Sequence, residues 1–261
     1  MKSVQSSGSQ QIESLGRVLD VLELFSAEQL ELSLTEVAER LGWPTPTAHR
    51  VVSTLVAREF LTRDPESKRL RLGAGVLRLA APLMATMGLP QVAQPHLDRL
   101  ATDMGETVNL AVLDGAEIMY IASASGSFLL RVETPPGLRL PAHCTALGKS
   151  MLAQLEPAAV RERLGTGPYT TLTPKSVKSW KQLSPQLKAA RELGYAVSLE
   201  EYEVGLNSCA VPVPTRNGIP AAINVAALAS RVSSKDLVRR FVPKLQATAD
   251  LIGRGLSPDN N

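Results

Sequence analysis

The sequence is poor in aromatic residues and in cysteine. Aromatic side chains make up 4% of the 261 residues, so the core must be built mainly from aliphatic side chains. The two cysteines, Cys144 and Cys209, are too few for the disulfide framework of a small secreted domain. A reducing, cytoplasmic setting is therefore expected.

The sequence also lacks a long uninterrupted apolar run. The most apolar stretch, residues 76–93, is broken by Arg78, Pro82 and Pro90. This pattern predicts a buried helix and no membrane span. The first sixteen residues, "MKSVQSSGSQQIESLG", have no apolar centre of the kind that signal peptides carry.

The charge is balanced, with a net charge of +3 that implies no partner by itself. Hydrophobic residues at 44% and charged residues at 20% are typical of a soluble globular protein. The length allows one large domain or two smaller ones.

The first 73 residues predict three helices and a hairpin. A Ser- and Gln-rich tail at 1–12 is expected to be disordered, and apolar residues then recur at helical spacing over 13–25. "SLTE" at 33–36 is a capping box that starts a second helix, which Gly42 ends. The third helix is expected to begin with Thr45 as N-cap and Pro46 in its first turn. "FLTRDPESKRLRLG" at 60–73 alternates around a turn signal, which predicts a two-stranded hairpin.

This order of elements is that of a winged helix-turn-helix, in which the third helix enters the DNA major groove. Arg50 lies opposite the apolar stripe of that helix and is the best candidate for a bidentate contact to guanine. The hairpin supplies basic residues for phosphate or minor-groove contact. The predicted DNA-binding residues are Thr45, Thr47, His49, Arg50, Ser53, Thr54, Arg63, Lys68, Arg69 and Arg71.

The charge distribution supports DNA as a partner. Residues 1–73 carry nine basic and ten acidic side chains, whereas residues 44–73 alone carry six basic and three acidic ones. Positive charge thus gathers on the segment that is predicted to meet DNA. The alternative is a non-enzymatic small-molecule-binding interaction protein whose helical domain docks a protein partner.

The rest of the chain predicts a mixed helical and stranded domain. An unusually broad apolar surface over 74–90 indicates a linker helix that also makes a dimer interface, and a second helical stretch follows to 104. Expected strands lie at 108–113, 117–123, 128–133, 195–198, 208–214 and 219–228, with "RNG" between the last two. Expected helices lie at 146–154, 157–164, 185–193 and, at the end, 237–252. The fold class is α+β, with domains at 13–73 and 91–261.

Two segments carry a resemblance to a known family. "LPAHCTALGKSMLAQL" at 140–155 and "ELGYAVSLEEYEVGLNSCAVPV" at 192–213 look like hallmark segments of IclR-type transcriptional regulators. "SLGRVLDVLELF" at 14–25 and "LTEVAERLGWPTPTAHRVVSTL" at 34–55 resemble the DNA-binding domain of the same family. The resemblance implies a winged-helix domain and a GAF-like α/β effector domain. It also implies a homodimer, often a dimer of dimers, on a pseudo-palindromic operator. Such a protein represses or activates a catabolic operon in response to a small molecule, without cofactor or metal.

The helix start at Thr145–Gly148 has small residues and free N–H groups, which favour an anion. By resemblance, the effector-contacting positions are Ala146, Leu147, Ser198, Ser208, Asn224 and Ala226. Thr145 and Cys209, which adjoin two of them, are also predicted to contact the effector. Relatives that bind very small oxo-acids tend to carry an acidic residue at position 198 and a serine at position 226. Ser198 and Ala226 instead favour a larger, aromatic carboxylate. Tyr202, Phe128 and Leu130 are candidates for an apolar wall or for the core.

The spacing of reactive residues gives little support to the hypothesis that the protein is an enzyme. His143 and Cys144 form a possible nucleophile pair, but sequence neighbours on a strand point to opposite faces. A zinc site that adds Cys209 and Glu201 has no ligand spacing typical of zinc. The glycines at 73–75 are too few for a phosphate loop. Lys149 and Lys188 are interpreted as solvated helix positions, and Glu200–Glu201 as a cap or surface pair.

Overall fold

The computed structural model describes residues 13–26, 29–215 and 219–256, and of residues 81–87 only the backbone. The predicted tail at 1–12 and the "RNG" at 216–218 lie outside the described residues. The chain forms two compact units, Met1–Thr86 and Met87–Asn261. Among the described helices, none has the length and apolarity needed to cross a bilayer.

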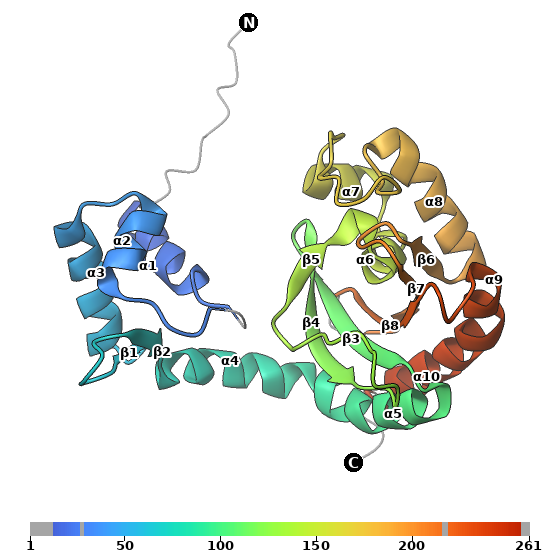
Figure 1. The fold of residues 1–261 in the computed structure, drawn as a ribbon, viewed down its shortest axis with the longest axis horizontal. Coiled ribbons are helices and arrows are strands. Elements are labelled where there is room, and N and C mark those ends of the chain that lie inside the picture. Colours follow the sequence, from blue (N-terminus) through green and yellow to red (C-terminus); the bar gives the residue numbers. More distant parts are fainter. Residues whose placement is uncertain (1–12, 27–28, 216–218, 257–261) are drawn as a thin grey trace, which may run out of the picture. The chain divides into compact units, whose positions relative to one another are not determined.

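The first unit is a small helical bundle with a hairpin (Figure 1). It contains α1 (Glu13–Glu23), α2 (Leu34–Leu41) and α3 (Thr45–Ala57), followed by strands β1 (Leu61–Arg63) and β2 (Leu70–Leu72). Its core joins one apolar face of each helix to the inner residues of the hairpin. The fully or almost fully buried members include Val21, Val37, Ala48, Val52, Leu55, Leu61 and Leu70.

The capping box that begins α2 is confirmed. The Ser33 hydroxyl accepts the Glu36 N–H at 3.2 Å, and the Glu36 carboxylate accepts the Ser33 N–H at 2.7 Å. Gly42 ends the helix in the left-handed conformation, at φ 65°. The expectation that Thr45 caps α3 was wrong. The carbonyl of Pro44 accepts the N–H groups of Thr47 and Ala48, so Pro44 is the N-cap and Thr45 already belongs to the helix.

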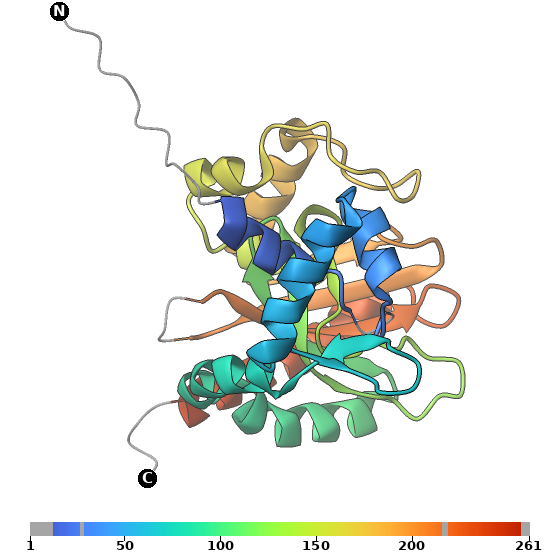
Figure 2. The same ribbon diagram turned by 90° about the vertical axis from the view of Figure 1, so that its left-hand side faces the viewer.

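The predicted hairpin is confirmed, and Figure 2 shows it continuing from the end of α3. β1 and β2 pair antiparallel, with Leu61 opposite Leu72. In the turn, the Asp64 carboxylate accepts the N–H groups of Glu66 and Ser67, which is why "DPES" reverses the chain. α4 (Ala74–Met87) follows the hairpin.

The second unit is built on one antiparallel sheet of order β5-β4-β3-β8-β7-β6. The strands are β3 (Thr107–Asp114), β4 (Glu117–Ala124), β5 (Arg139–Pro141), β6 (Ala196–Leu199), β7 (Leu206–Val213) and β8 (Ala221–Leu228). The two central strands, β3 and β8, come from segments that are remote in the sequence. The sheet therefore brings together polar side chains from both ends of the second unit.

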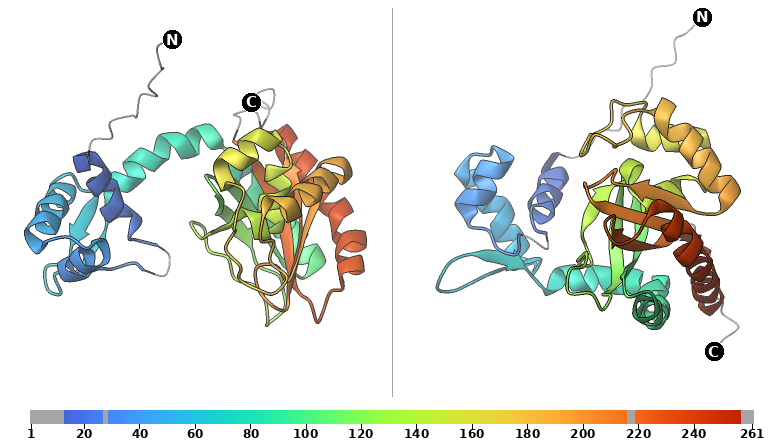
Figure 3. Two further views of the ribbon diagram at one scale, coloured as in Figure 1. Left: turned by 90° about the horizontal axis from the view of Figure 1, so that it is seen from above. Right: turned by 45° about the vertical axis from the view of Figure 1, so that its right-hand side comes forward.

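Helices cover both faces of this sheet (Figures 1 and 3). α5 (Leu89–Met104) and α10 (Val242–Gly255) pack on one face over an aliphatic core. The other face is covered by α6 (Ala146–Leu152) and α8 (Trp180–Leu193), with α7 (Pro157–Leu164) beside them. A short 3-10 turn, Ala142–Cys144, leads into α6, and α9 (Ser234–Asp236) with a π-helical turn, Leu237–Phe241, leads into α10.

Several sequence predictions for this unit need correction. No strand forms at 128–133, where Leu129 is 97% exposed and Leu130 69% exposed, because a strand needs one face to bury. β5 at 139–141 is the strand that sequence reasoning missed. α8 begins at Trp180, five residues before the expected start. The expected single terminal helix instead begins as α9 and the π-helical turn.

Candidate functional site

The predicted DNA-reading residues lie along one side of α3. Five of them are exposed, namely Thr45, His49, Arg50, Ser53 and Thr54, and Thr47 is half-buried. The opposite side of α3, with Ala48, Val52 and Leu55, is buried in the core. The helix therefore has the one buried and one presented side that a recognition helix needs.

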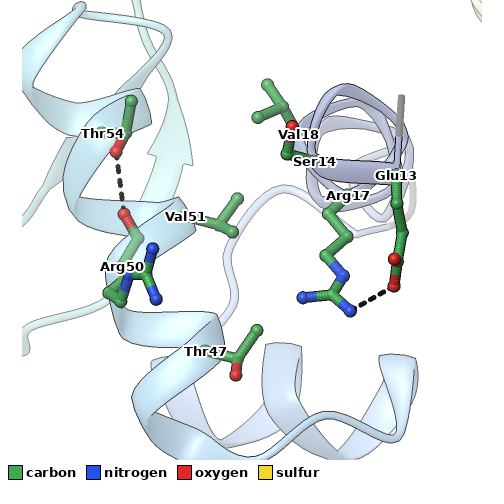
Figure 4. Close-up of a pocket in the computed structure, with 8 residues that line it drawn as sticks. All are labelled: Glu13, Ser14, Arg17, Val18, Thr47, Arg50, Val51 and Thr54. Carbon is green, nitrogen blue, oxygen red and sulfur yellow. Dashed lines mark hydrogen bonds and ion pairs between the residues drawn. The ribbon is translucent and has the colours of Figure 1, made fainter.

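A hollow of about 350 Å³ separates α3 from α1 (Figure 4). Figure 4 shows Arg17 of α1 and Arg50 of α3 on opposite sides of this hollow, with Thr47 on the α3 side. Arg17 pairs with Glu13 and lies 5.9 Å from the Trp43 ring centroid. Among the described residues, the Arg50 guanidinium makes no hydrogen bond or ion pair. Its five N–H donors are available to an external acceptor.

Two other polar groups on α3 are engaged internally. The Thr54 hydroxyl donates to the Arg50 carbonyl oxygen at 2.9 Å, which uses its proton. Ser53 Oγ lies 3.5 Å from His49 Nδ1. Among the described residues of this surface, Arg50 is thus the charged side chain that makes the fewest hydrogen bonds and ion pairs within the protein.

The hairpin carries its charge differently from what the sequence predicted. Arg69 pairs with Glu31 at 3.2 Å and with Glu36 at 3.4 Å, and Arg71 also pairs with Glu31. The acidic residues that seemed to be separate from the basic segment therefore neutralise part of it. Of the predicted hairpin cations, Arg63 and Lys68 make no ion pair within the described residues.

The second unit contains a cavity of about 160 Å³ between the sheet and the start of α6. Polar lining comes from four strands, from the cap of α6 and from the segments that precede β5 and β7. The lining residues are Tyr120, Val132, Glu133, Thr134, Leu138, Leu140, Thr145, Ser198, Tyr202, Glu203, Leu206, Ser208, Asn224 and Ala226.

Small polar side chains of the sheet line this cavity or lie directly beneath it. Strand pairing places Ser198 opposite Ser208 and Asn224 opposite Asn109. Asn109 in turn lies opposite Ser123 of β4. The register shift between Leu110 and Ala111 brings Ser123 and Tyr120 to the same face, although they are three residues apart.

Hydrogen bonds link Asn224, Asn109 and Ser123 into one polar row across the sheet. Asn109 Nδ2 donates to Asn224 Oδ1 at 3.0 Å, and Asn109 Oδ1 accepts from Ser123 Oγ at 2.8 Å and from Thr134 Oγ1. Ser198 Oγ donates to the Cys144 carbonyl oxygen at 2.9 Å, so its proton is used. Asn109 was not predicted from the sequence, because a lone asparagine in an apolar run gives no sign of a partner 115 residues away.

Five of the eight predicted effector positions line the cavity: Thr145, Ser198, Ser208, Asn224 and Ala226. The side chains of Ala146 and Leu147 are fully buried in the core instead. Thr145 Oγ1 accepts the Gly148 N–H at 3.0 Å, which occupies one of the N–H groups that the sequence offered to an anion.

Cys209 needs correction as an effector-contacting residue. It follows Ser208 on β7, so it faces the opposite side of the sheet, where it is fully buried against the α10 layer. Its thiol lies 3.8 Å from the Leu237 carbonyl oxygen, and burial raises its pKa to about 12. Phe128 and Leu130 also fail as core or wall residues, because both are exposed, and Phe128 lies under Arg231.

Lys149 is the largest error in the sequence interpretation. It is only 2% exposed, and its Nζ lies 2.6 Å from Glu201 Oε1 and 2.8 Å from Gln186 Oε1. Burial lowers the pKa of Lys149 and raises that of Glu201. Glu200, its neighbour, pairs at the surface with Lys175. The two adjacent glutamates thus diverge, one into the core and one to solvent.

His143 and Cys144 do not form a nucleophile pair. His143 Nε2 lies 2.9 Å from the Thr170 carbonyl oxygen, whereas the Cys144 thiol points to the Pro141 carbonyl oxygen at 3.6 Å. Burial, followed by the charge of Glu201, raises the pKa of the Cys144 thiol to about 12. A thiol held in its protonated form is a poor nucleophile.

Comparison with known proteins accounts for both units. Residues 14–65 match the IclR helix-turn-helix domain, and residues 82–254 match the family described as bacterial transcriptional regulator IclR C-terminal. The regulator XynR of Escherichia coli is 32% identical over 246 residues, covering 94% of this chain and 97% of XynR. The p-hydroxybenzoate hydroxylase transcriptional activator of Acinetobacter baylyi is 33% identical over 249 residues, covering 92% of this chain and 90% of the activator.

A solved structure shares the whole architecture. An IclR homologue from Microbacterium hydrocarbonoxydans, complexed with 4-hydroxybenzoate, superposes with a TM-score of 0.81 at 28% identity. The superposition covers 93% of this chain and 98% of that one. The curated relatives are transcriptional regulators, and enzymatic readings of His143, Cys144 and Glu201 therefore have no support.

Proposed function

Because this chain belongs to the IclR family of bacterial transcriptional regulators, we propose that it controls a catabolic operon in response to a small aromatic carboxylate. α3 and the hairpin contact the operator, and the cavity of the second unit holds the effector. The observation that carries the proposal is the combination of Arg50, which has no partner among the described residues and lies on the presented side of α3, with a cavity in the other unit that polar and apolar side chains line together.

The exposed side of α3 supports contact with DNA. Arg50 reads a guanine through a bidentate contact, because its planar fork matches the O6 and N7 acceptors. Arg63 and Lys68 contact phosphates, since neither is committed to an ion pair among the described residues. Arg69 and Arg71 exchange their glutamate partners for phosphates only at some cost in hairpin stability. Arg17, across the hollow from Arg50, is a further phosphate contact.

The volume of the cavity limits the size of the effector. About 160 Å³ is close to the 150 Å³ cavity that accepts benzene in an engineered protein. One aromatic ring therefore fills most of it. One relative is named as the activator of p-hydroxybenzoate hydroxylase, and a solved IclR homologue is complexed with 4-hydroxybenzoate, which supports the same class of ligand here.

The lining of the cavity determines how a charged effector is held. Among the described residues, no lysine or arginine lines the cavity, so neutral donors hold the carboxylate, namely the hydroxyl groups of Ser208, Tyr120 and Tyr202 and the amide of Asn224. Burial raises the pKa of Tyr120 and Tyr202, which keeps both hydroxyls protonated. Two glutamates also line the cavity, at positions 133 and 203, but they are exposed, so water screens their repulsion of an anion.

Exposed apolar side chains on α4 support assembly as a homodimer. Leu77 is 69% exposed and Leu79 68% exposed, so α4 leaves two large apolar side chains in water that a partner would cover. The side chains of Leu83 and Met84, which the sequence also assigned to this interface, lie outside the described residues. A two-fold dimer reads a pseudo-palindromic operator, and a dimer of dimers reads two such sites.

The test combines DNA and effector binding. Mobility shifts on the region upstream of its own gene should show salt-dependent binding, and 4-hydroxybenzoate or benzoate should change that affinity roughly five- to 150-fold, the usual range of allosteric coupling. Ser208→Leu should abolish effector binding by calorimetry while leaving operator binding in the ligand-free protein intact. If the chain binds no DNA at any salt concentration, the alternative of a protein-docking helical unit stands.

A further inference from the structure

The hydrogen bonds beneath the cavity single out Asn109, which does not itself line it. Asn109 lies on β3, is fully buried, and sits in the middle of the polar row. Its Oδ1 accepts from two hydroxyl groups, those of Ser123 and Thr134, which uses both lone pairs. Its Nδ2 donates to Asn224 Oδ1. The Asn109 amide therefore has a partner on each branch.

This pattern decides how Asn224 presents its own amide. The Oδ1 branch of Asn224 is turned toward Asn109, so the other branch of the amide, Nδ2, is the one left for the cavity that Asn224 lines. Among the described residues, Asn224 Nδ2 makes no hydrogen bond. Asn224 thus offers the cavity the N–H donors of Nδ2, while its amide oxygen is turned toward Asn109.

We propose that Asn109 is a positioning residue that holds the Asn224 amide with Nδ2 toward the cavity and so selects an effector that presents a hydrogen-bond acceptor, such as a carboxylate oxygen. The inference rests on the proposed effector site and adds the means by which that site rejects a ligand of the same shape that can only donate.

The distance to Ser123 favours this orientation of both amides. Ser123 Oγ lies 2.8 Å from Asn109 Oδ1, the usual length of an O–H···O bond. The 3.0 Å N–H···O bond between the two amides would form in either orientation if both turned together. Turning both amides over would place Asn224 Oδ1 in the cavity, where it would repel a carboxylate. The two orientations therefore select opposite ligands.

Benzoate and benzamidine are the probes that separate these orientations. Both are planar and of similar size, but benzoate only accepts hydrogen bonds at its polar end and benzamidine only donates. By calorimetry, wild-type protein should bind benzoate at least about tenfold more tightly than benzamidine, since one buried hydrogen bond to a charged group is worth about that factor or more.

Asn109→Asp should reverse this preference. An aspartate still accepts from Ser123 and Thr134 but cannot donate, so Asn224 must turn over to donate its own Nδ2. Asn224 Oδ1 then faces the cavity. The affinity for benzoate should fall about tenfold or more, and that for benzamidine should rise.

The matched control separates this reversal from the new negative charge. Asn207→Asp introduces the same charge on β7 next to Ser208 but on the opposite face of the sheet, where Asn207 Nδ2 donates to the Val232 carbonyl oxygen. Asn207→Asp should keep the preference for benzoate. An equal loss of preference in both variants would mean that charge alone is responsible, and would overturn the proposal.

A measurement without ligand tests the orientation directly. The chain has six asparagines, so selective ¹⁵N labelling of asparagine gives few side-chain NH₂ signals. The NH₂ of Asn224 should exchange with solvent faster than that of Asn109, and benzoate should slow it. Equal protection of the two groups in the ligand-free protein would overturn the proposal. If neither probe binds, the proposed effector class fails, while this exchange still decides the orientation.

Ser123→Ala covers the case in which Asn109→Asp does not fold. It removes one of the two hydroxyl donors that hold Asn109 Oδ1, at a half-buried position where a small side chain is tolerated. The ratio of the affinity for benzoate to that for benzamidine should fall. An unchanged preference in a folded Ser123→Ala protein would show that the hydroxyl groups do not fix the amides.

Discussion

The two units of this protein keep their functional chemistry in opposite places. In the first unit the residues proposed to meet DNA are mostly exposed, come from α3, the hairpin and α1, and leave the core to aliphatic side chains. In the second unit the polar residues proposed to meet the effector are largely buried and come from several strands and a helix cap. A partner as large as a duplex is met by a surface, whereas a single small molecule must be enclosed.

This difference has consequences for mutation. An exposed arginine on α3 contributes little to folding, so its loss should affect binding alone. A buried polar residue in the second unit has been taken out of water and depends on its partners, so its loss should affect folding first. Substitutions in both units can therefore test whether binding or folding is affected first.

The largest effect is expected from Lys149→Met. It leaves the Glu201 carboxylate buried without its partner at 2.6 Å, and breaking such a pair typically costs about 3–5 kcal/mol in the free energy of unfolding. Denaturant unfolding followed in the second unit measures it. Lys188→Met, in an exposed pair that is 80% accessible on the lysine side, is the control and should change stability little.

The loss of stability caused by Lys149→Met should become smaller at acidic pH. Burial already raises the pKa of Glu201, and losing the lysine raises it further. A carboxyl whose folded pKa is raised contributes stability below its unfolded value and loses it as pH rises. The deficit of the variant should therefore shrink as pH falls toward 4.5. A deficit that is equal at pH 4.5 and at neutral pH would speak against an unpaired carboxylate as its cause.

The next effect is expected from Arg50→Ala, which should cost about 1–3 kcal/mol in operator binding and relax the preference at one base pair. Its unfolding midpoint should stay that of the wild type, because the guanidinium has no internal partner among the described residues. Arg163→Ala, exposed on α7, is the control for loss of one positive charge. Loss of folding in Arg50→Ala, or normal affinity in a folded variant, would remove the contrast between the units.

The same contrast explains what could be predicted from the sequence. The capping box at Ser33, the stop at Gly42 and the hairpin turn at Asp64 are local signals, and each was read correctly. The polar row at the cavity depends on which strands become neighbours, and no local sequence pattern predicts that Asn109 contacts Asn224. Lys149 was misread for the same reason, since its partner Glu201 is 52 residues away.

Sequence periodicity was also an unreliable guide to isolated or very short strands. The alternation of Phe128 and Leu130 resembles a strand, but a strand forms only where a neighbour and a buried face exist, and this segment has neither. β5 has three residues and was missed because so short a strand has too few residues to show a period. The resemblance to IclR regulators supplied the effector positions, and strand alternation alone explains why Cys209 was wrong.

A pH effect is expected in the second unit, from His143. Burial lowers the pKa of His143, although its bond to the Thr170 carbonyl oxygen acts the other way. A group with a depressed folded pKa contributes stability that is complete above its unfolded pKa, near 6.5, and is lost as pH falls through the folded pKa. The free energy of unfolding should therefore fall as the solution is acidified from above pH 6.5 to below the folded pKa. His143→Gln should reduce that slope, and an identical slope in the variant would exclude His143 as its source.

The smallest effect, and the one of opposite sign, is expected from Gly16→Ala, for which Gly148→Ala is the contrasting substitution. Gly16 lies inside α1, where an added Cβ would have no neighbouring atom within 4 Å, so Gly16→Ala should raise the free energy of unfolding of the first unit by about 0.5–1 kcal/mol. Gly148 lies inside α6, where a Cβ would overlap the Ala142 carbonyl oxygen, so Gly148→Ala should destabilise the second unit instead. Thermal unfolding of both variants measures the difference. If both substitutions were stabilising, α6 would be free to move away from the turn at Ala142–Cys144. The side chains around the cavity would then be packed less tightly than their burial implies.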